Sequence, residues 1–235
     1  SWKSSDVVLD VAVHIGTLLS VIIYFREDLK SMAAGSFSAI TGKGPARESS
    51  LALYILIASI PVILAGLVLN ALGPDWVRSL HVVAWTTLIF GIVLWIADRF
   101  SPAQKTLNDI TLKSSLIIGF SQVLALIPGT SRSGITMTAA RLCGLNREDS
   151  AKFSLFLAII AIAGAGTLSG IDLFQKDNTS LGYDALLAMI IAFISGWAAI
   201  TLMMRWLQQF SFLPFVIYRI ALGGTLLILL YTPLY

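Results

Sequence analysis

Charged residues are scarce in this chain. Lys, Arg, Asp and Glu make up 12% of its 235 residues, whereas apolar residues make up 57%. A soluble domain contains about a quarter charged residues, so this composition excludes a soluble globular enzyme and a disordered chain. The 16 basic residues are spread along the sequence without the basic stripe that nucleic-acid binding requires. We therefore expect an integral membrane protein with no nucleic-acid partner.

Cysteine is nearly absent as well. The single Cys143 excludes an internal disulfide and a cysteine-based metal cluster. The common signatures of soluble enzymes, such as the Walker loop, the His-Glu-x-x-His zinc motif and the dinucleotide fingerprint, do not occur in the sequence. The polar chemistry must therefore be sought inside the apolar runs and at their ends.

Long apolar runs are the dominant feature of the sequence. A helix needs about 20 apolar residues to cross a bilayer, and six runs approach that length. Pro61 lies inside the second run, where a membrane helix tolerates a kink. The six predicted transmembrane helices are residues 7–24, 51–72, 82–97, 153–173, 181–204 and 212–231.

A seventh apolar run, residues 114–127, is too short to cross the membrane. As a helix it reaches about 21 Å, less than the hydrocarbon thickness of about 30 Å. A polar, Gly-containing turn at 128–134 and a second short apolar stretch at 135–142 follow at once. Irregular backbone at membrane depth is tolerated where it lines a cavity or is buried in protein. We therefore predict an all-α fold of six transmembrane helices plus a re-entrant helix hairpin over residues 114–142.

Basic residues gather on one side of this predicted topology. Most Lys and Arg residues lie in residues 25–50, which we interpret as a loop, and in the segments that flank the hairpin. Because cytoplasmic loops carry an excess of Lys and Arg, we expect the hairpin to enter the membrane from the cytoplasm.

The spans suggest two related halves within a single membrane domain, residues 1–235. Residues 112–235 contain the hairpin and three spans, whereas residues 1–111 contain three spans alone. An odd number of spans gives the halves opposite orientations, and inverted repeats of this kind place a site at their interface. A partner hairpin is therefore expected before Ser1, where the sequence begins without an initiator Met.

The turn Pro-Gly-Thr-Ser-Arg-Ser-Gly at residues 128–134 has the chemistry of a phosphate site. Its glycines permit backbone N–H groups to approach a ligand, and the next half-helix begins there with its positive end toward the same spot. Arg132 adds a guanidinium that binds phosphate oxygens bidentately, at a cost of about 2.5–3.5 kcal/mol for a charge at membrane depth. That cost favours a function over the alternative, a simple capped helix break. The expected hydrogen-bond donors beside Arg132 are Thr130, Ser131, Ser133 and Thr136.

Two other polar groups lie inside predicted spans. Arg219, in the last span, either helps to hold a diphosphate or pairs with a buried carboxylate or helix-end carbonyls. His14 follows Asp10 by one helical turn and shares a helix face with it. That pair is either an acid–base couple or a hydrogen-bonded packing arrangement, and we favour packing.

Some residues are expected to have structural roles only. We interpret the acidic residues at predicted helix ends, Asp98 among them, as solvated caps and topology signals. Gly164, Gly166 and Gly170 are expected to permit close helix packing.

The stretch Leu-Ile-Pro-Gly-Thr-Ser-Arg-Ser-Gly-Ile-Thr at residues 126–136 resembles a signature of the bacterial undecaprenyl-diphosphate phosphatases, the bacitracin-resistance protein family. Residues 9–19, 153–158 and 212–219 are similar to the same family. The resemblance implies a multi-pass enzyme of the bacterial cytoplasmic (inner) membrane with its active site facing the periplasm. It would hydrolyse undecaprenyl diphosphate to undecaprenyl phosphate and inorganic phosphate, which recycles the lipid carrier for peptidoglycan synthesis and confers bacitracin resistance.

The resemblance also implies roles for individual residues. Arg132 and Ser131 are the catalytic candidates: Arg132 would stabilise charge on the transferring phosphoryl group, and Ser131, with no base visible beside it, is treated as a binder. The resemblance further implies a divalent metal, Mg²⁺ or Ca²⁺, whose carboxylate ligands belong to a family signature outside this chain. The residues expected to bind the substrate phosphates are Gly129, Thr130, Ser133, Gly134, Thr136 and Arg219, with His14 as a weaker candidate.

A transporter or flippase of a polyprenyl phosphate lipid is the alternative function. Inverted repeats and half-helices at the midplane are also hallmarks of transporters, so the residues alone do not separate the two. Bilayer lipids and undecaprenyl diphosphate are the expected partners, and a homodimer is a candidate assembly.

Overall fold

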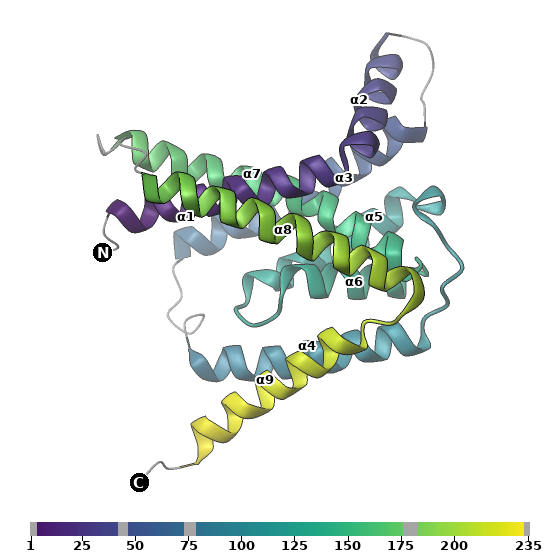
Figure 1. The fold of residues 1–235 in the computed structure, drawn as a ribbon. Helices are drawn as coiled ribbons and strands as arrows, with labels where there is room; N and C mark the ends of the chain where they lie inside the picture. Colours follow the sequence, from purple (N-terminus) through teal and green to yellow (C-terminus); the bar gives the residue numbers. More distant parts are fainter. Residues whose placement is uncertain (1–3, 42–46, 73–78, 176–182, 233–235) are drawn as a thin grey trace. The chain divides into compact units, whose positions relative to one another are not determined.

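The computed structural model describes residues 4–41, 47–72, 79–175 and 183–232, and most of these residues lie in helices (Figure 1). They contain no β-strand, and one isolated parallel bridge joins Lys105 and Leu145. The helices are α1 (Ser4–Tyr24), α2 (Arg26–Ile40), α3 (Arg47–Leu72), α4 (Leu80–Phe100), α5 (Leu112–Val123), α6 (Arg132–Leu142), α7 (Arg147–Gln175), α8 (Tyr183–Gln209) and α9 (Leu213–Tyr231), with short 3-10 turns η2 (Leu107–Asp109) and η3 (Leu124–Leu126).

Four of the described helices are long and apolar enough to cross a membrane: α3, α4, α8 and α9. Helices α1 and α2 together form a fifth candidate that is bent by 77°. Large apolar side chains such as Leu56 and Leu64 of α3 are more than half exposed, as suits a surface in contact with lipid tails. The chain is therefore an all-helical, multi-pass membrane protein.

Helices also occupy the described parts of the six predicted spans, of which residues 181–182 lie outside the described residues. Helix α7 covers residues 153–173, although its last side chains lie outside the described residues. Pro61 lies inside α3, as expected. The interpretation of residues 25–50 as a loop is wrong, because Arg26–Ile40 form α2. Charged residues of α2 pair with one another along the helix, as Lys30 does with Glu27 at 3.2 Å. These charges are therefore compatible with helix formation.

By its internal contacts the chain divides into two compact units. The first consists of residues Ser1–Ser49 and Phe156–Arg205, and the second of residues Ser50–Leu155 and Trp206–Tyr235. In the first unit α1 packs closely on α8, because Gly16 lies against the backbone of Met189. Phe25 and Phe156 add an edge-to-face ring contact at 5.2 Å. The predicted halves, residues 1–111 and 112–235, are defined by topology rather than by contacts and stay a prediction.

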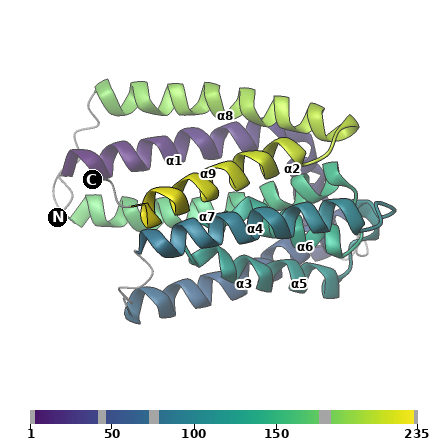
Figure 2. The ribbon, with the colours of Figure 1, turned by 90° about the horizontal axis from the view of Figure 1, so that it is seen from below.

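The second unit holds the hairpin. Helices α4 and α9 lie side by side in both views (Figures 1 and 2), and Gly223 of α9 lies against the backbone of Leu88 of α4. Helix α5 contacts α3 closely, since a Cβ at Gly119 would overlap the backbone of Ala58. Small residues thus permit close helix approach.

The glycines predicted to have this packing role are different ones. Within the described residues, a Cβ at Gly164 or Gly166 of α7 would meet no atom within 4 Å. The expectation that these two positions permit close packing is therefore wrong, whereas the surroundings of Gly170 lie outside the described residues.

Candidate functional site

The hairpin consists of two half-helices around a break, as predicted. Thr111 caps the first one, because its Oγ1 accepts the Ser114 N–H at 3.2 Å. Helix α5 and the turn η3 then form a short apolar segment, Leu112–Leu126. The second half-helix, α6, begins at Arg132, three residues earlier than the predicted apolar stretch at 135–142. Arg132, Ser133 and Gly134 therefore belong to the first turn of α6.

Ser131 is the residue that starts α6. Its Oγ accepts the backbone N–H of Gly134 at 3.2 Å, which caps the helix. Its φ is +69°, and among the described residues it is the one non-glycine with positive φ. Such a conformation costs about 1–3 kcal/mol and is typical of functional sites.

Gly129 fits closely against α4. Its φ is +86°, in the region that favours glycine. A Cβ at this position would also overlap the Thr86 hydroxyl and the Val83 carbonyl. The backbone of the turn can approach α4 this closely only because residue 129 has no side chain.

Side chains from α4 and α9 hold the carbonyl groups of the turn. Thr86 Oγ1 lies 2.6 Å from the Pro128 carbonyl oxygen, and Thr87 Oγ1 lies 3.2 Å from the Gly129 carbonyl oxygen. Arg219 Nη2 donates to the same Gly129 carbonyl at 2.9 Å. The sequence predicts that Arg219 either helps to hold a diphosphate or pairs with a buried carboxylate or helix-end carbonyls. In the structure its partner is a carbonyl group, and that carbonyl belongs to the hairpin turn.

Arg219 reaches the turn through a narrow space. Its side chain is only 8% exposed, and a Cβ at Gly91 of α4 would lie 3.0 Å from the Arg219 Cβ. A Cβ at Gly134 would lie 3.7 Å from Arg219 Nη1, so the guanidinium lies beside the first turn of α6. The structure therefore brings Arg219, Gly129 and Gly134 together.

The remaining predicted residues of the turn have different surroundings. Arg132 is half-buried and Ser133 is exposed, both in the first turn of α6. Thr130 is fully buried, and its Oγ1 has no hydrogen-bond partner among the described residues. The Thr136 hydroxyl is buried 2.7 Å from Ser154 Oγ, which ties α6 to α7.

His14 belongs to the first compact unit. Its Nδ1 lies 2.8 Å from the Asp10 carbonyl oxygen and 3.5 Å from the Asp10 carboxylate. The predicted local pair is thus confirmed, with both side chains substantially exposed. A role of His14 at the turn stays a prediction.

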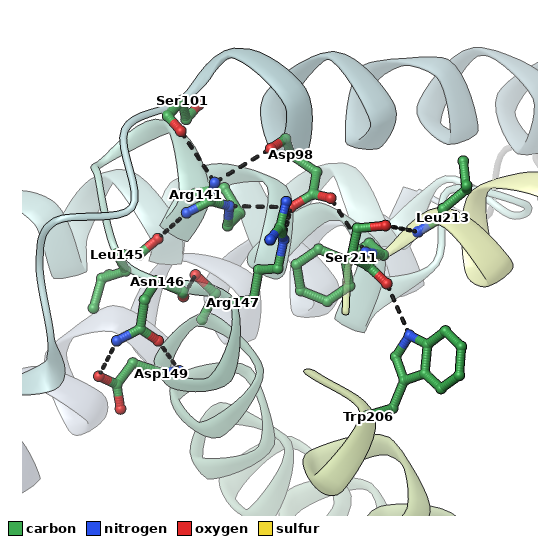
Figure 3. A network of polar contacts seen from close by, with 12 residues as sticks. Asp98, Ser101, Arg141, Leu145, Asn146, Arg147, Asp149, Trp206, Ser211 and Leu213 are labelled. Atoms are coloured by element: carbon green, nitrogen blue, oxygen red, sulfur yellow. Dashed lines mark hydrogen bonds and ion pairs between the residues drawn. The ribbon is translucent and has the colours of Figure 1, made fainter. Parts of the chain in front are cut away.

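A buried ion network holds the base of the hairpin (Figure 3). Asp98 of α4 is 7% exposed; it accepts from Arg147 Nε at 2.7 Å and lies 3.4 Å from Arg141 Nε. It also accepts the backbone N–H of Phe212 at 3.2 Å. Arg141, which is 1% exposed, donates to the Ser101 carbonyl at 3.1 Å. The interpretation of Asp98 as a solvated cap is therefore wrong, because partners from three other segments surround it.

Backbone contacts close the same end of the hairpin. The N–H of Lys105 donates to the Gly144 carbonyl at 3.0 Å, and the N–H of Asn146 donates to the Lys105 carbonyl at 2.8 Å. Asp149 accepts from the Asn146 amide at 2.9 Å and from the Leu107 N–H at 3.1 Å. The segments before and after the hairpin are thus joined directly, which fixes its two ends.

No metal-binding cluster occurs in the described part of the chain. Within it, no group of three or more His, Cys, Asp or Glu side chains could hold a metal ion. The described residues therefore do not provide the ligand set for Mg²⁺ or Ca²⁺, and the expectation of a divalent metal stays a prediction.

Comparison with known proteins finds one family model and a set of similar undecaprenyl-diphosphatases. Residues 1–225 match the family model described as bacitracin resistance protein BacA. The undecaprenyl-diphosphatase of Hahella chejuensis is 45% identical over 230 residues, which cover 98% of this chain and 86% of that protein. The undecaprenyl-diphosphatase of Dinoroseobacter shibae is 47% identical over 96% of this chain and 85% of its own. That of Roseobacter denitrificans is 44% identical over 95% of this chain and 84% of its own.

Proposed function

The chain belongs to the bacitracin resistance protein BacA family, and on this basis we propose that it hydrolyses undecaprenyl diphosphate to undecaprenyl phosphate and inorganic phosphate. The named relatives support this activity through their high identity over nearly the whole chain. One structural observation connects it to particular residues. Arg219 contacts the turn at which α6 begins, and Arg132 is the first residue of that helix. A helix N-terminus attracts anions, and two guanidinium groups there suit a diphosphate.

The reaction replaces a phosphoanhydride bond by a bond to water. The water oxygen joins the terminal phosphorus, the bond to the bridging oxygen breaks, and that oxygen leaves with undecaprenyl phosphate. Catalysis of such transfers is mainly positioning and stabilisation of developing charge. We assign that stabilisation to Arg132 and Arg219. Arg219 has five N–H donors and uses one of them on Gly129, which leaves others for phosphate oxygens.

Hydroxyl and backbone groups of the turn complete the proposed site. A hydroxyl both accepts and donates, so Ser131 can cap α6 through its oxygen and still donate its proton to a phosphate oxygen. We assign further contacts to Thr130 and Ser133 and to the backbone N–H of Gly129. Gly134, whose N–H donates to Ser131 Oγ, contributes by leaving space beside Arg219, because it has no side chain. Thr136 takes a supporting role in this proposal, because its hydroxyl contacts Ser154.

We also propose the finer topology. Six membrane segments and the re-entrant hairpin would form two inverted halves in the bacterial cytoplasmic membrane, with the site open to the periplasm. The four long apolar helices and the bent α1–α2 pair support this topology, as does the Lys and Arg bias toward one side. No step of the proposed reaction is assigned to a metal, and a homodimer stays a candidate assembly.

Phosphate release from undecaprenyl diphosphate in detergent tests the proposed activity. The full-length protein is compared with Arg132→Ala, with and without Mg²⁺ or Ca²⁺. Arg205→Ala, at an exposed position of α8, is the matched control. We expect release by wild type and the control, and a loss of about 10²–10³-fold in Arg132→Ala. Transfer of the lipid across vesicle membranes without phosphate release under any of these conditions would favour the transport alternative.

A further inference from the structure

Two neighbouring threonines of α4 contact the turn that carries the proposed phosphate site. The Thr86 hydroxyl contacts the Pro128 carbonyl, and the Thr87 hydroxyl contacts the Gly129 carbonyl. Neither threonine belongs to the turn or to α9. We propose that Thr86 and Thr87 are positioning residues, which orient the turn so that its N–H groups and Arg219 meet the diphosphate. This inference rests on the proposed hydrolase function and adds residues to its site.

The contacts with α4 set the direction of the peptide groups in the turn. In a trans peptide the C=O and the N–H point in opposite directions. Because the Pro128 carbonyl points to Thr86 on α4, the N–H of Gly129 points away from α4. Carbonyl oxygens repel phosphate and N–H groups attract it. Holding these carbonyls on α4 therefore keeps them away from the anion.

Arg219 and Thr87 donate to the same carbonyl group. A carbonyl oxygen has two lone pairs, and the Gly129 carbonyl accepts from both Thr87 and Arg219. Both side chains are less than one-tenth exposed, so the arrangement is screened little by water. If Thr87 loses its hydroxyl, the carbonyl loses one of its two anchors, and Arg219 loses a fixed acceptor.

Thr86 differs from an ordinary helical threonine, because it also contacts a carbonyl outside its own helix. Helical threonines commonly bond to their own helix, as Thr201 does to the Trp197 carbonyl at 2.8 Å. Thr86 has such an acceptor in Val82 at 2.7 Å and, unlike Thr201, also contacts a carbonyl outside its own helix, that of Pro128 at 2.6 Å. Since a hydroxyl has one proton, the local and the long-range acceptor share it, and the contact with Pro128 joins the turn to α4.

The test uses pairs of substitutions that differ by the hydroxyl alone. Thr86→Val and Thr87→Val remove the hydroxyl at nearly constant shape, whereas Thr86→Ser and Thr87→Ser retain it. Thr201→Val removes a hydroxyl whose bond is local to α8 and is the control. Two quantities are measured in detergent: kcat and KM for phosphate release from undecaprenyl diphosphate, and the Kd of a methylene-bridged farnesyl diphosphonate by calorimetry.

We expect kcat/KM to fall about 10- to 100-fold in the Val variants, as for a small misplacement of reacting groups. In the same Val variants the Kd of the diphosphonate should rise about tenfold, as expected for the loss of one or two oriented hydrogen bonds. Thr86→Ser, Thr87→Ser and Thr201→Val should stay within about twofold of wild type.

Three results would overturn the inference. The first is Val variants whose kcat/KM and diphosphonate Kd equal those of wild type. The others are Ser variants, or a Thr201→Val control, whose kcat/KM falls as much as that of the Val variants. If a Val variant does not fold, the corresponding Thr→Ala variant is compared with its Ser partner. The Kd does not depend on hydrolysis. Wild type that binds the diphosphonate without releasing phosphate would contradict the proposed activity, while the Kd series would still decide the positioning role.

Discussion

Arg219 Nη2 of α9 donates to the carbonyl oxygen of Gly129 in the hairpin turn at 2.9 Å, although 90 residues separate the two in sequence. The same carbonyl accepts from Thr87 of α4. Three segments of the chain thus meet at one peptide group. The bond places a buried guanidinium beside the start of α6, which is the position where an anion would be stabilised most.

Gly129→Ala tests how closely the turn must approach α4. The added Cβ would overlap the Thr86 hydroxyl and the Val83 carbonyl, at a residue whose φ is +86°. We expect a loss of about 2–4 kcal/mol in unfolding free energy from strain and overpacking together, with loss of phosphate release. Thermal unfolding in detergent measures the first effect. Gly164→Ala, where no described atom lies within 4 Å, is the control, and an equal effect of both substitutions would contradict the close fit.

Asp98→Asn tests the network at the base of the hairpin. The substitution leaves Arg141, which is 1% exposed, without its carboxylate. Breaking a buried ion pair from one side costs about 3–5 kcal/mol, so the unfolding temperature should fall strongly. Asp184→Asn, at an exposed position in the first turn of α8, should change it little. Similar unfolding temperatures for the two variants would show that the Asp98 charge is not required.

Gln122→Leu addresses a buried amide on α5. Gln122 is almost completely buried, and within the described residues neither its Oε1 nor its Nε2 has a hydrogen-bond partner. An unpaired buried polar group costs about 1–3 kcal/mol. We therefore expect the Leu variant to unfold about 2–6 °C higher than wild type, measured against Gln209→Leu at an exposed site. A lower unfolding temperature would reveal that ordered water partners the amide.

The single thiol gives a prediction about pH. Burial raises the pKa of Cys143, more than the nearby Lys105 ammonium lowers it. The reactive thiolate is therefore rarer at pH 7 than in an unperturbed thiol of pKa about 8.5, and alkylation should accelerate as the pH rises beyond that value. Mass spectrometry of N-ethylmaleimide labelling between pH 7 and 10 measures this rate. Labelling at pH 7 as fast as that of glutathione would contradict it.

The hairpin could be predicted because its signal is local. A short apolar run that ends in Pro-Gly and a polar segment requires a break, and the structure has one between α5 and α6. The second half-helix is predicted to begin at the turn, and α6 does begin within it, at Arg132. The cap at Ser131 brings polar residues into the first turn of that helix.

Contacts over long sequence separations could not be predicted in this way. Arg147 follows Asp98 by 49 residues, so the sequence shows an acidic residue at the end of a span and nothing of its partner. Thr86 resembles any helical threonine until the turn is placed on α4. Helix α2 was missed for another reason: its charges suggested a loop, although Lys30 and Glu27 pair one helical turn apart.

The most direct test of the central claim is a double-mutant cycle on Arg132 and Arg219. Arg132→Lys, Arg219→Lys and the double variant are compared by kcat/KM for phosphate release from undecaprenyl diphosphate in detergent. If both guanidinium groups bind one diphosphate at the hairpin turn, the effects should be non-additive, with a coupling of about 0.5–3 kcal/mol. Strictly additive effects, or full activity of Arg219→Lys, would contradict a shared site.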